Sequence, residues 1–199
     1  EAGGELLRYA RQILGALKDA DAAISALKGL TGGRISVGVV STAKYFAPAL
    51  IAHFQRRYPG VRASLSVNNR EVIVRELEKN EIDVAIMGMP PPRIETKAMP
   101  FADHPLVVIA PPAHPLAAVH RIALASLADE TFLVREQGSG TRSSMERFFA
   151  ERGFVPKIGN VMSSNETIKQ AVMADMGLAF ISRHTIGFEL QAGRLVELD

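Results

Sequence analysis

The first stretch of the chain carries apolar residues at alternating spacings of four and three. This spacing is that of an a/d heptad seam, and neither a proline nor a β-branched run interrupts it. One long helix is therefore predicted over residues 5–28, ended by Gly29 and by the Thr31-Gly32-Gly33 turn. The helix would pack either on its own domain or on a second chain, and the narrow, continuous seam favours the second chain. The seam residues are Leu6, Ala10, Ile13, Leu17, Ala20, Ile24 and Leu27.

Beyond Gly33 the pattern changes to buried strands that alternate with amphipathic helices. Strands are predicted at residues 35–40, 61–67 and 82–86. One helix spans the apolar positions from Tyr45 to Phe54 and stops before Pro59, and another covers residues 69–79. A β-α-β-α-β run with short turns predicts a parallel sheet covered by helices on both faces.

The second half of the chain repeats this alternation after a stretch rich in proline and polar residues at 90–105. A strand at 106–110 is bracketed by prolines, which suits a segment that crosses between two lobes. The fold class predicted is α/β, with two lobes and a cleft between them. Further strands are expected at 131–134, 158–162, 178–181 and 194–198, and further helices at 141–152 and 165–176.

Polar turns follow four of these strands, where an open α/β sheet places its ligands. They are Ser41-Thr42, Asn68 to Glu71, Gln137 to Arg142 and Ser163 to Glu166, and the second and fourth have capping-box spacing. Each can present free backbone N–H groups at the positive end of a helix, which suits a carboxylate or a phosphate. For any single turn, however, ordinary helix capping explains the same residues. A binding site therefore depends on the turns converging.

Two features of these turns sharpen the prediction of an anion site. Arg70 and Arg142 would add charge-assisted hydrogen bonds to a bound anion. Gly138 and Gly140, on either side of Ser139, would let the backbone approach a ligand closely.

Composition excludes several classes of function. The formal net charge of +2, from 23 basic and 21 acidic residues, gives no sign of a nucleic-acid-binding face. The absence of cysteine excludes disulfides and thiolate metal sites. No apolar run approaches the roughly 18 residues of a membrane helix. The five histidines lack metal-binding spacing, and no nucleophile elbow or phosphate-binding loop occurs, so neither a metal site nor an enzyme is predicted.

Several longer motifs resemble the effector-binding domain of LysR-type transcription regulators. The resemblance covers essentially the whole chain, with residues 5–28 similar to the linker helix of that family. A closer resemblance, to the subgroup that controls Calvin-cycle carbon-fixation operons, rests on residues 41–48, 138–142 and 163–170. The family motifs are Ile35 to Val39 followed by Ser41-Thr42, Phe54 to Val61, Asn80 to Ile86, His114 to Leu116 and Met173 to Ala179.

The resemblance implies two Rossmann-like lobes of the type II periplasmic-binding-protein fold behind a linker helix. The expected domains are the helix at 1–30, lobe I at 31–105 and lobe II at 106–199, with the return of the chain to lobe I missing. It also implies a cytoplasmic homodimer or homotetramer that reaches promoter DNA only through an N-terminal helix-turn-helix domain. The cleft residues expected are Ser41, Thr42, Asn69, Arg70, Gly138, Ser139, Gly140, Thr141, Arg142 and Asn165.

The function expected is metabolite sensing without catalysis, a cofactor or a membrane. The subgroup implies an effector such as a phosphorylated sugar, phosphoenolpyruvate or NADPH. The alternative is a periplasmic solute-binding protein for a small anion, which would share the fold and the cleft. The heptad seam and the lack of a signal peptide favour the regulator.

Overall fold

The computed structural model describes residues 2–27 and 32–199. The chain forms two compact units. The first contains Glu1–Asn68 and Val72–Thr96, and the second contains Asn69–Glu71 and Lys97–Asp199. The sequence placed the corresponding boundary after residue 105. Within the described ranges, no helix has the length and apolar character needed to cross a membrane.

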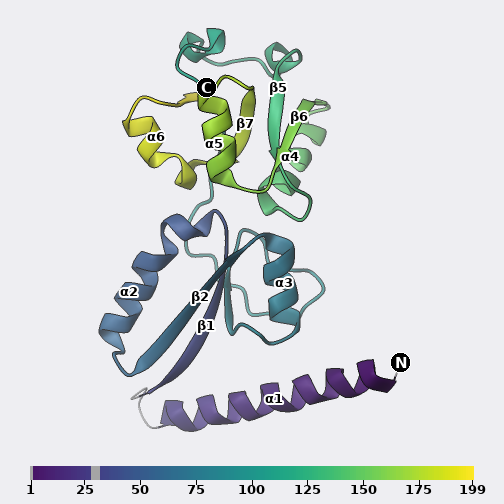
Figure 1. Ribbon diagram of the computed structural model, residues 1–199, viewed down its shortest axis with the longest axis vertical. Helices are drawn as coiled ribbons and strands as arrows, with labels where there is room; N and C mark the ends of the chain where they lie inside the picture. The colour runs from purple at the N-terminus through teal and green to yellow at the C-terminus, as the bar shows by residue number, and fades with distance from the viewer. Residues whose placement is uncertain (1, 28–31) are drawn as a thin grey trace. The chain divides into compact units, whose positions relative to one another are not determined.

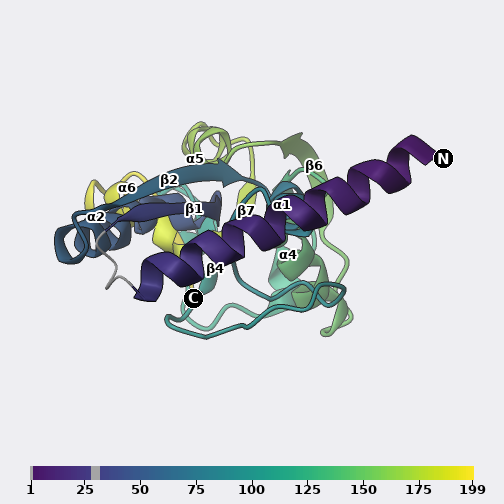
Figure 2. The same ribbon diagram turned by 90° about the horizontal axis from the view of Figure 1, so that it is seen from below.

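Helix α1, Ala2–Leu27, is continuous, as the heptad spacing predicts (Figure 2). Four of its seam residues, Leu6, Ile13, Leu17 and Ile24, are each more than half exposed. The predicted end of the helix at Gly29 and Thr31 lies outside the described residues.

The first unit is built on a three-stranded parallel sheet with the order β2-β1-β3. Figure 1 shows its strands β1 and β2 beside each other. Strand β1 pairs with β2 along its whole length, from Gly33 opposite Val61 to Val40 opposite Asn68. The strands are β1 Gly33–Val40, β2 Val61–Asn68 and β3 Val84–Ile86, and the helices are α2 Ala47–Arg57, α3 Arg70–Glu78 and the short 3-10 helix η1 Ala43–Tyr45.

Successive residues of β1 point to opposite faces of this sheet, and a different helix packs on each face. Val37 and Val39 pack with Ala47 of α2 in one core cluster. On the opposite face, the backbone of Gly38 lies close under the side chains of Ile73, from α3, and Ile82. The period-two pattern of residues 35–40 thus places two helices on opposite faces of the sheet, as the sequence predicts.

The second unit is built on a five-stranded mixed sheet with the order β6-β5-β7-β4-β8. Strand β5 is parallel to β6 and β7, whereas β4 is antiparallel to β7 and β8. The strands are β4 Leu106–Ala110, β5 Thr131–Arg135, β6 Lys157–Met162, β7 Leu178–Ser182 and β8 Val196–Leu198. The helices are α4 Gly140–Ala150, α5 Asn165–Met173 and α6 Gly187–Gln191, with 3-10 helices η2 Pro115–Ala118, η3 Leu124–Leu127 and η4 Arg183–Thr185.

Two separate cores cover the two faces of this sheet. Leu133 of β5 packs with Ile168 and Val172 of α5. Its neighbour Phe132 packs with Phe149 of α4. Because successive strand residues point to opposite faces, α5 covers one face and α4 the other. Helix α4 follows β5 along the chain and α5 follows β6, so the two helices begin beside the carboxyl ends of these strands.

Three expectations about helix ends are wrong. Helix α5 stops at Met173, short of 176, because Asp175 takes a left-handed conformation (φ 59°) and closes a Schellman turn in which Met176 N–H donates to the Ala171 carbonyl. The residue that caps α5 is Ser164, one position after the Ser163 of the capping-box pattern. Likewise α3 begins at Arg70, so Asn68 lies inside β2 and its side chain donates to Glu76.

Candidate functional site

Two strand-to-helix turns of the second unit form the candidate site. Arg135 and Glu136 stand where β5 ends, and Ser163 to Asn165 stand where β6 ends. Strands β5 and β6 are parallel neighbours, so both turns lie at the same edge of the sheet. Their backbones are joined where Glu136 N–H donates to the Met162 carbonyl over 3.1 Å. This is the edge at which open α/β sheets bind ligands.

The first turn ends in the N-terminus of α4. Gly138 has a φ of 81°, a conformation that L side chains rarely adopt, and a Cβ there would overlap the carboxylate of Glu71. Ser139 is the N-cap residue of α4, yet its hydroxyl makes no capping hydrogen bond within the described part of the chain. Ser139 and Thr141 are both buried. The turn thus combines a helix N-terminus with two buried hydroxyl side chains.

The second turn ends in the N-terminus of α5. The Ser164 hydroxyl accepts a hydrogen bond from Glu166 N–H over 3.2 Å, which is an ordinary cap. Asn165, at the first position of the helix, is only 1% exposed. Its Nδ2 atom has no hydrogen-bond partner among the described residues. A buried amide donor in this state is a position where an acceptor atom of a ligand would be stabilised.

Arg135, which sequence reasoning missed, connects the two turns. The residue is 3% exposed. Its guanidinium donates to both carboxylate oxygens of Glu136, over 2.8 and 3.0 Å. The same group donates to Asn165 Oδ1 and, over 3.4 Å, to the Ser163 carbonyl. The guanidinium is therefore held in place by both turns.

Glu136 is ionised in this network. Burial alone would raise the pKa of Glu136, but hydrogen bonds and charge from Arg135, helped by the Asn69 amide, lower it below its usual value. Arg135 and Glu136 therefore carry opposite charges at neutral pH and largely cancel each other.

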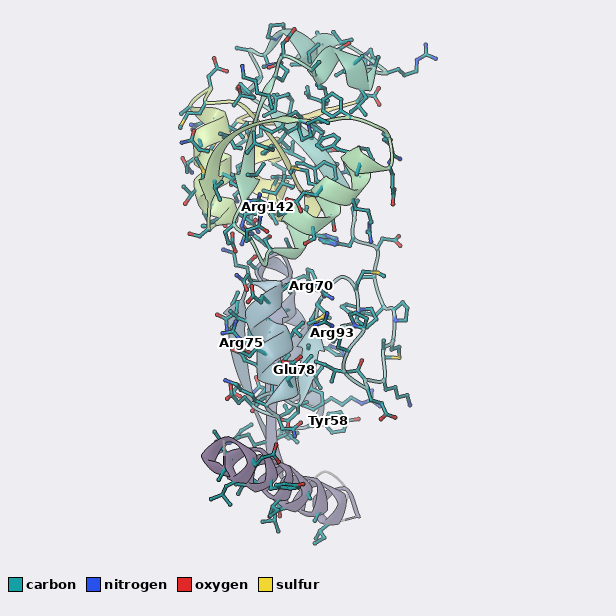
Figure 3. All side chains as sticks on the ribbon, turned by 90° about the vertical axis from the view of Figure 1, so that its right-hand side faces the viewer. Tyr58, Arg70, Arg75, Glu78, Arg93 and Arg142 are labelled. Atoms are coloured by element: carbon teal, nitrogen blue, oxygen red, sulfur yellow. The ribbon has the colours of Figure 1, made fainter. Side chains whose placement is uncertain are left out.

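The start of α3 also belongs to the second unit. The Asn69 amide donates to Glu136 over 3.3 Å, and Glu71 N–H donates to the Gly138 carbonyl over 3.2 Å. Arg70 lies close enough to Gly140 that an added Cβ there would contact the Arg70 side chain at 3.5 Å. Arg70, Arg75 and Glu78 follow one another along α3 (Figure 3).

Comparison with known proteins gives the family. The profile of the LysR substrate binding domain matches residues 28–199, which is most of the chain. The chain belongs to this LysR family.

The curated relatives of this LysR domain are transcription regulators. It is 49% identical over 199 residues to the RuBisCO operon transcriptional regulator of Allochromatium vinosum, covering 100% of this chain and 66% of that protein. It is 50% identical over 198 residues to the HTH-type transcriptional regulator CbbR of Rhizobium meliloti (strain 1021), covering 99% of this chain and 63% of that protein. The chain thus spans slightly less than two thirds of the length of these relatives.

A solved structure supports the same fold. The CcmR regulatory domain of Synechocystis PCC6803, in complex with 2-PG, matches with a TM-score of 0.80 and 41% identity. The match covers 84% of this chain and 80% of that domain. The two-lobe fold of LysR effector-binding domains, predicted from the sequence, is therefore confirmed.

The ten predicted site residues of the LysR domain fall into two groups. Eight of them, Asn69, Arg70, Gly138, Ser139, Gly140, Thr141, Arg142 and Asn165, belong to the second unit, and Ser41 and Thr42 belong to the first. Ser41 and Thr42 follow β1, but α2 begins only at Ala47, after the 3-10 helix η1. The first predicted turn therefore opens a 3-10 helix, and Phe46 takes the N-cap position of α2.

Arg142 has contacts that the sequence did not predict. It lies at the start of α4 (Figure 3). Its Nε donates to Glu146 over 2.8 Å, and its Nη1 donates to the Arg135 carbonyl over 3.1 Å. These contacts anchor the first turn of α4 to the end of β5, so Arg142 supports the shape of the site.

Sequence reasoning missed Arg135 and Glu136 because they look like the exposed end of a strand. The signal that was available is position: Arg135 directly follows the buried run Phe132 to Val134, at the carboxyl edge of the sheet. A long cation at that place must either reach solvent or find buried partners.

Proposed function

We propose that this chain is the effector-sensing part of a LysR-type transcription regulator that binds a small anionic metabolite and controls carbon-fixation genes. The observation that carries the proposal is the buried, unpartnered amide of Asn165 beside the N-termini of α4 and α5. Helix N-termini and amide N–H groups both stabilise negatively charged oxygens. The printed names of the curated relatives, regulators of RuBisCO operons, support the carbon-fixation part.

The effector class that suits this site is a small phosphorylated or carboxylated metabolite. Phosphorylated sugars, phosphoenolpyruvate and NADPH are the candidates, and 2-PG, the ligand in the CcmR complex, joins them as a probe. Such ligands carry several acceptor oxygens, which match the hydroxyl, amide and backbone donors of the two turns. The chain is proposed to act by binding alone, without catalysis or a cofactor.

Regulation is proposed to follow from a population shift. An effector that binds one conformation of the domain better than another moves the equilibrium towards that conformation. A coupling free energy of roughly 1–3 kcal/mol is sufficient for useful control. Promoter DNA would be contacted by a separate helix-turn-helix domain, in a homodimer or homotetramer joined through α1.

Thermal denaturation against a panel of anions tests this proposal. The panel contains 2-PG, phosphoenolpyruvate, NADPH and a sugar bisphosphate, with inorganic sulfate as the control for ionic strength. At 100-fold excess over Kd, a ligand stabilises the folded protein by about 2.7 kcal/mol. For a chain of this length, the midpoint should then rise by roughly 5–10 °C. A folded chain whose midpoint responds to none of these compounds more than to sulfate would contradict the proposal.

A further inference from the structure

The guanidinium of Arg135 restricts how the Asn165 amide can be oriented. An arginine side chain offers only donors, so the atom of Asn165 that faces it must be an acceptor. Arg135 Nη1 donates to Asn165 Oδ1, which meets this requirement. Rotating the amide by half a turn would place Nδ2 against the guanidinium, donor against donor. The pair therefore leaves Nδ2 on the side away from Arg135.

This orientation decides which chemical groups the amide can bind. Asn165 is 1% exposed, and Nδ2 has no partner among the described residues. Since Nδ2 can only donate, it would stabilise an acceptor such as a phosphoryl or carboxylate oxygen. A ligand group that presents its own N–H at this place would leave two donors facing each other.

Arg135 is itself poorly placed to act as the counter-ion of an anionic ligand. Its Nε and Nη2 atoms are engaged by the two carboxylate oxygens of Glu136. Its Nη2 also donates to the Ser163 carbonyl, which fixes the plane of the guanidinium. Its charge is balanced, and its geometry is set from both turns. These contacts suit a group that orients a neighbour.

We infer that Arg135 is a positioning residue, which holds the Asn165 amide so that its donor faces the effector and thereby selects acceptor oxygens. This inference rests on the proposed function, because it concerns how the same site recognises its anion. Glu136 supports this role because its carboxylate holds the guanidinium of Arg135 in place.

The first test replaces the donor by an acceptor of the same shape, Asn165→Asp. The aspartate can still accept from Arg135, and an acidic residue is favourable in the first turn of α5, so the fold should be retained. Binding of 2-PG, measured by isothermal titration on the 199-residue chain, should weaken by at least roughly 100-fold, because a charge-assisted hydrogen bond is lost and a repulsion is added. Unchanged binding by a folded Asn165→Asp variant would overturn the inference.

The second test asks whether Arg135 acts through Asn165. Arg135→Gln is made in the wild-type chain and in the Asn165→Ala chain, and 2-PG binding is compared in a double-mutant cycle. In the wild-type background the substitution should weaken binding by roughly 10-fold, and in the Asn165→Ala background by less than about 2-fold. Equal losses in both backgrounds, the result expected of a merely structural role, would overturn the inference.

Stability is controlled in two ways. Because Arg135→Gln leaves the Glu136 carboxylate without its guanidinium, the cycle is repeated with Glu136→Gln present throughout. Arg147→Gln, at an exposed position on α4, is the matched control and should leave binding unchanged. If the wild-type chain binds none of 2-PG, phosphoenolpyruvate, NADPH and the sugar bisphosphate, the proposed function and the inference both fail. If it binds and the two losses are additive, only the inference fails.

Discussion

Lys169 shows, at the scale of single residues, what a buried charge requires. The residue is 3% exposed, and its ammonium group contacts Glu189 at 2.8 Å, Glu166 at 2.9 Å and the Thr185 carbonyl at 2.9 Å. These contacts fix α5 to η4 and α6. An ammonium group with this many acceptors is stable in the interior. Removing it leaves these acceptors without their positively charged partner.

Lys169→Met should therefore lower the free energy of unfolding by roughly 3 kcal/mol, because the largely buried carboxylate of Glu189 is left without its cation. Equilibrium unfolding in urea, followed by circular dichroism, measures the loss. Lys97→Met, at an exposed position, is the matched control and should change stability little. Adding Glu189→Gln to Lys169→Met should recover part of the loss. A Lys169→Met chain as stable as the control would contradict this view of the network.

A histidine pair gives the second prediction at this scale. The rings of His104 and His184 are stacked with centroids 6.1 Å apart, and partial burial, with a smaller effect of His184, lowers the pKa of His104 below its usual value. In the unfolded chain His104 takes up its proton near pH 6.5, before the folded chain does. Protonation thus favours unfolding as the pH falls below about 6.5.

Urea unfolding at pH 7.5 and pH 5.5 tests this sign. The wild-type chain should lose stability at the lower pH, and His104→Gln should lose less. Glu136 does not interfere, because its lowered pKa keeps it ionised throughout this window. An equal loss in both chains would show that another group is responsible.

At the scale of elements, the heptad seam of α1 makes the most direct prediction. Ile13 and Leu17 lie on the seam and are 61% and 62% exposed. If α1 pairs with a second copy, Ile13→Glu should place a charge in the apolar seam and shift the dimer towards monomer by at least roughly 10-fold in dissociation constant. Sedimentation equilibrium measures this shift. Gln12→Glu, off the seam, is the control, and equal dissociation constants for the two variants would contradict pairing through the seam.

Long periodic elements and apolar strands could be predicted from the sequence, whereas short helices could not. The period-two pattern of β1 and the heptads of α1 specify element type over many residues, so both were predicted. Helix α6 has five residues and the four 3-10 helices of the described residues have three or four each, too few for a period to be seen. The antiparallel pairing of β4 with β7 is set by contacts between residues distant in sequence, and a local periodic pattern does not reveal such contacts.

The sequence predicted which turns form the candidate site, but it did not predict the hydrogen-bond network that connects them. Gly138 could be found because a glycine in a turn has a local signature, and Asn165 was found through the resemblance to the LysR family. Arg135 and Asn165 are 30 residues apart, and only the parallel pairing of β5 with β6 brings them together. Which polar groups satisfy one another across such a distance is a property of the folded sheet.

At the scale of the whole molecule, the central claim is that the carboxyl edge of the second unit binds the effector. Isothermal titration of 2-PG and phosphoenolpyruvate into the wild-type chain and into Thr141→Ala tests it most directly. Thr141 is buried in the first turn of α4, whereas Thr96, the control for a threonine-to-alanine change, is exposed. Thr141→Ala should weaken binding by roughly 10-fold, the cost of one hydrogen bond to a charged ligand, while Thr96→Ala should bind as the wild type does. Equal affinity in a folded Thr141→Ala chain would contradict the placement of the site.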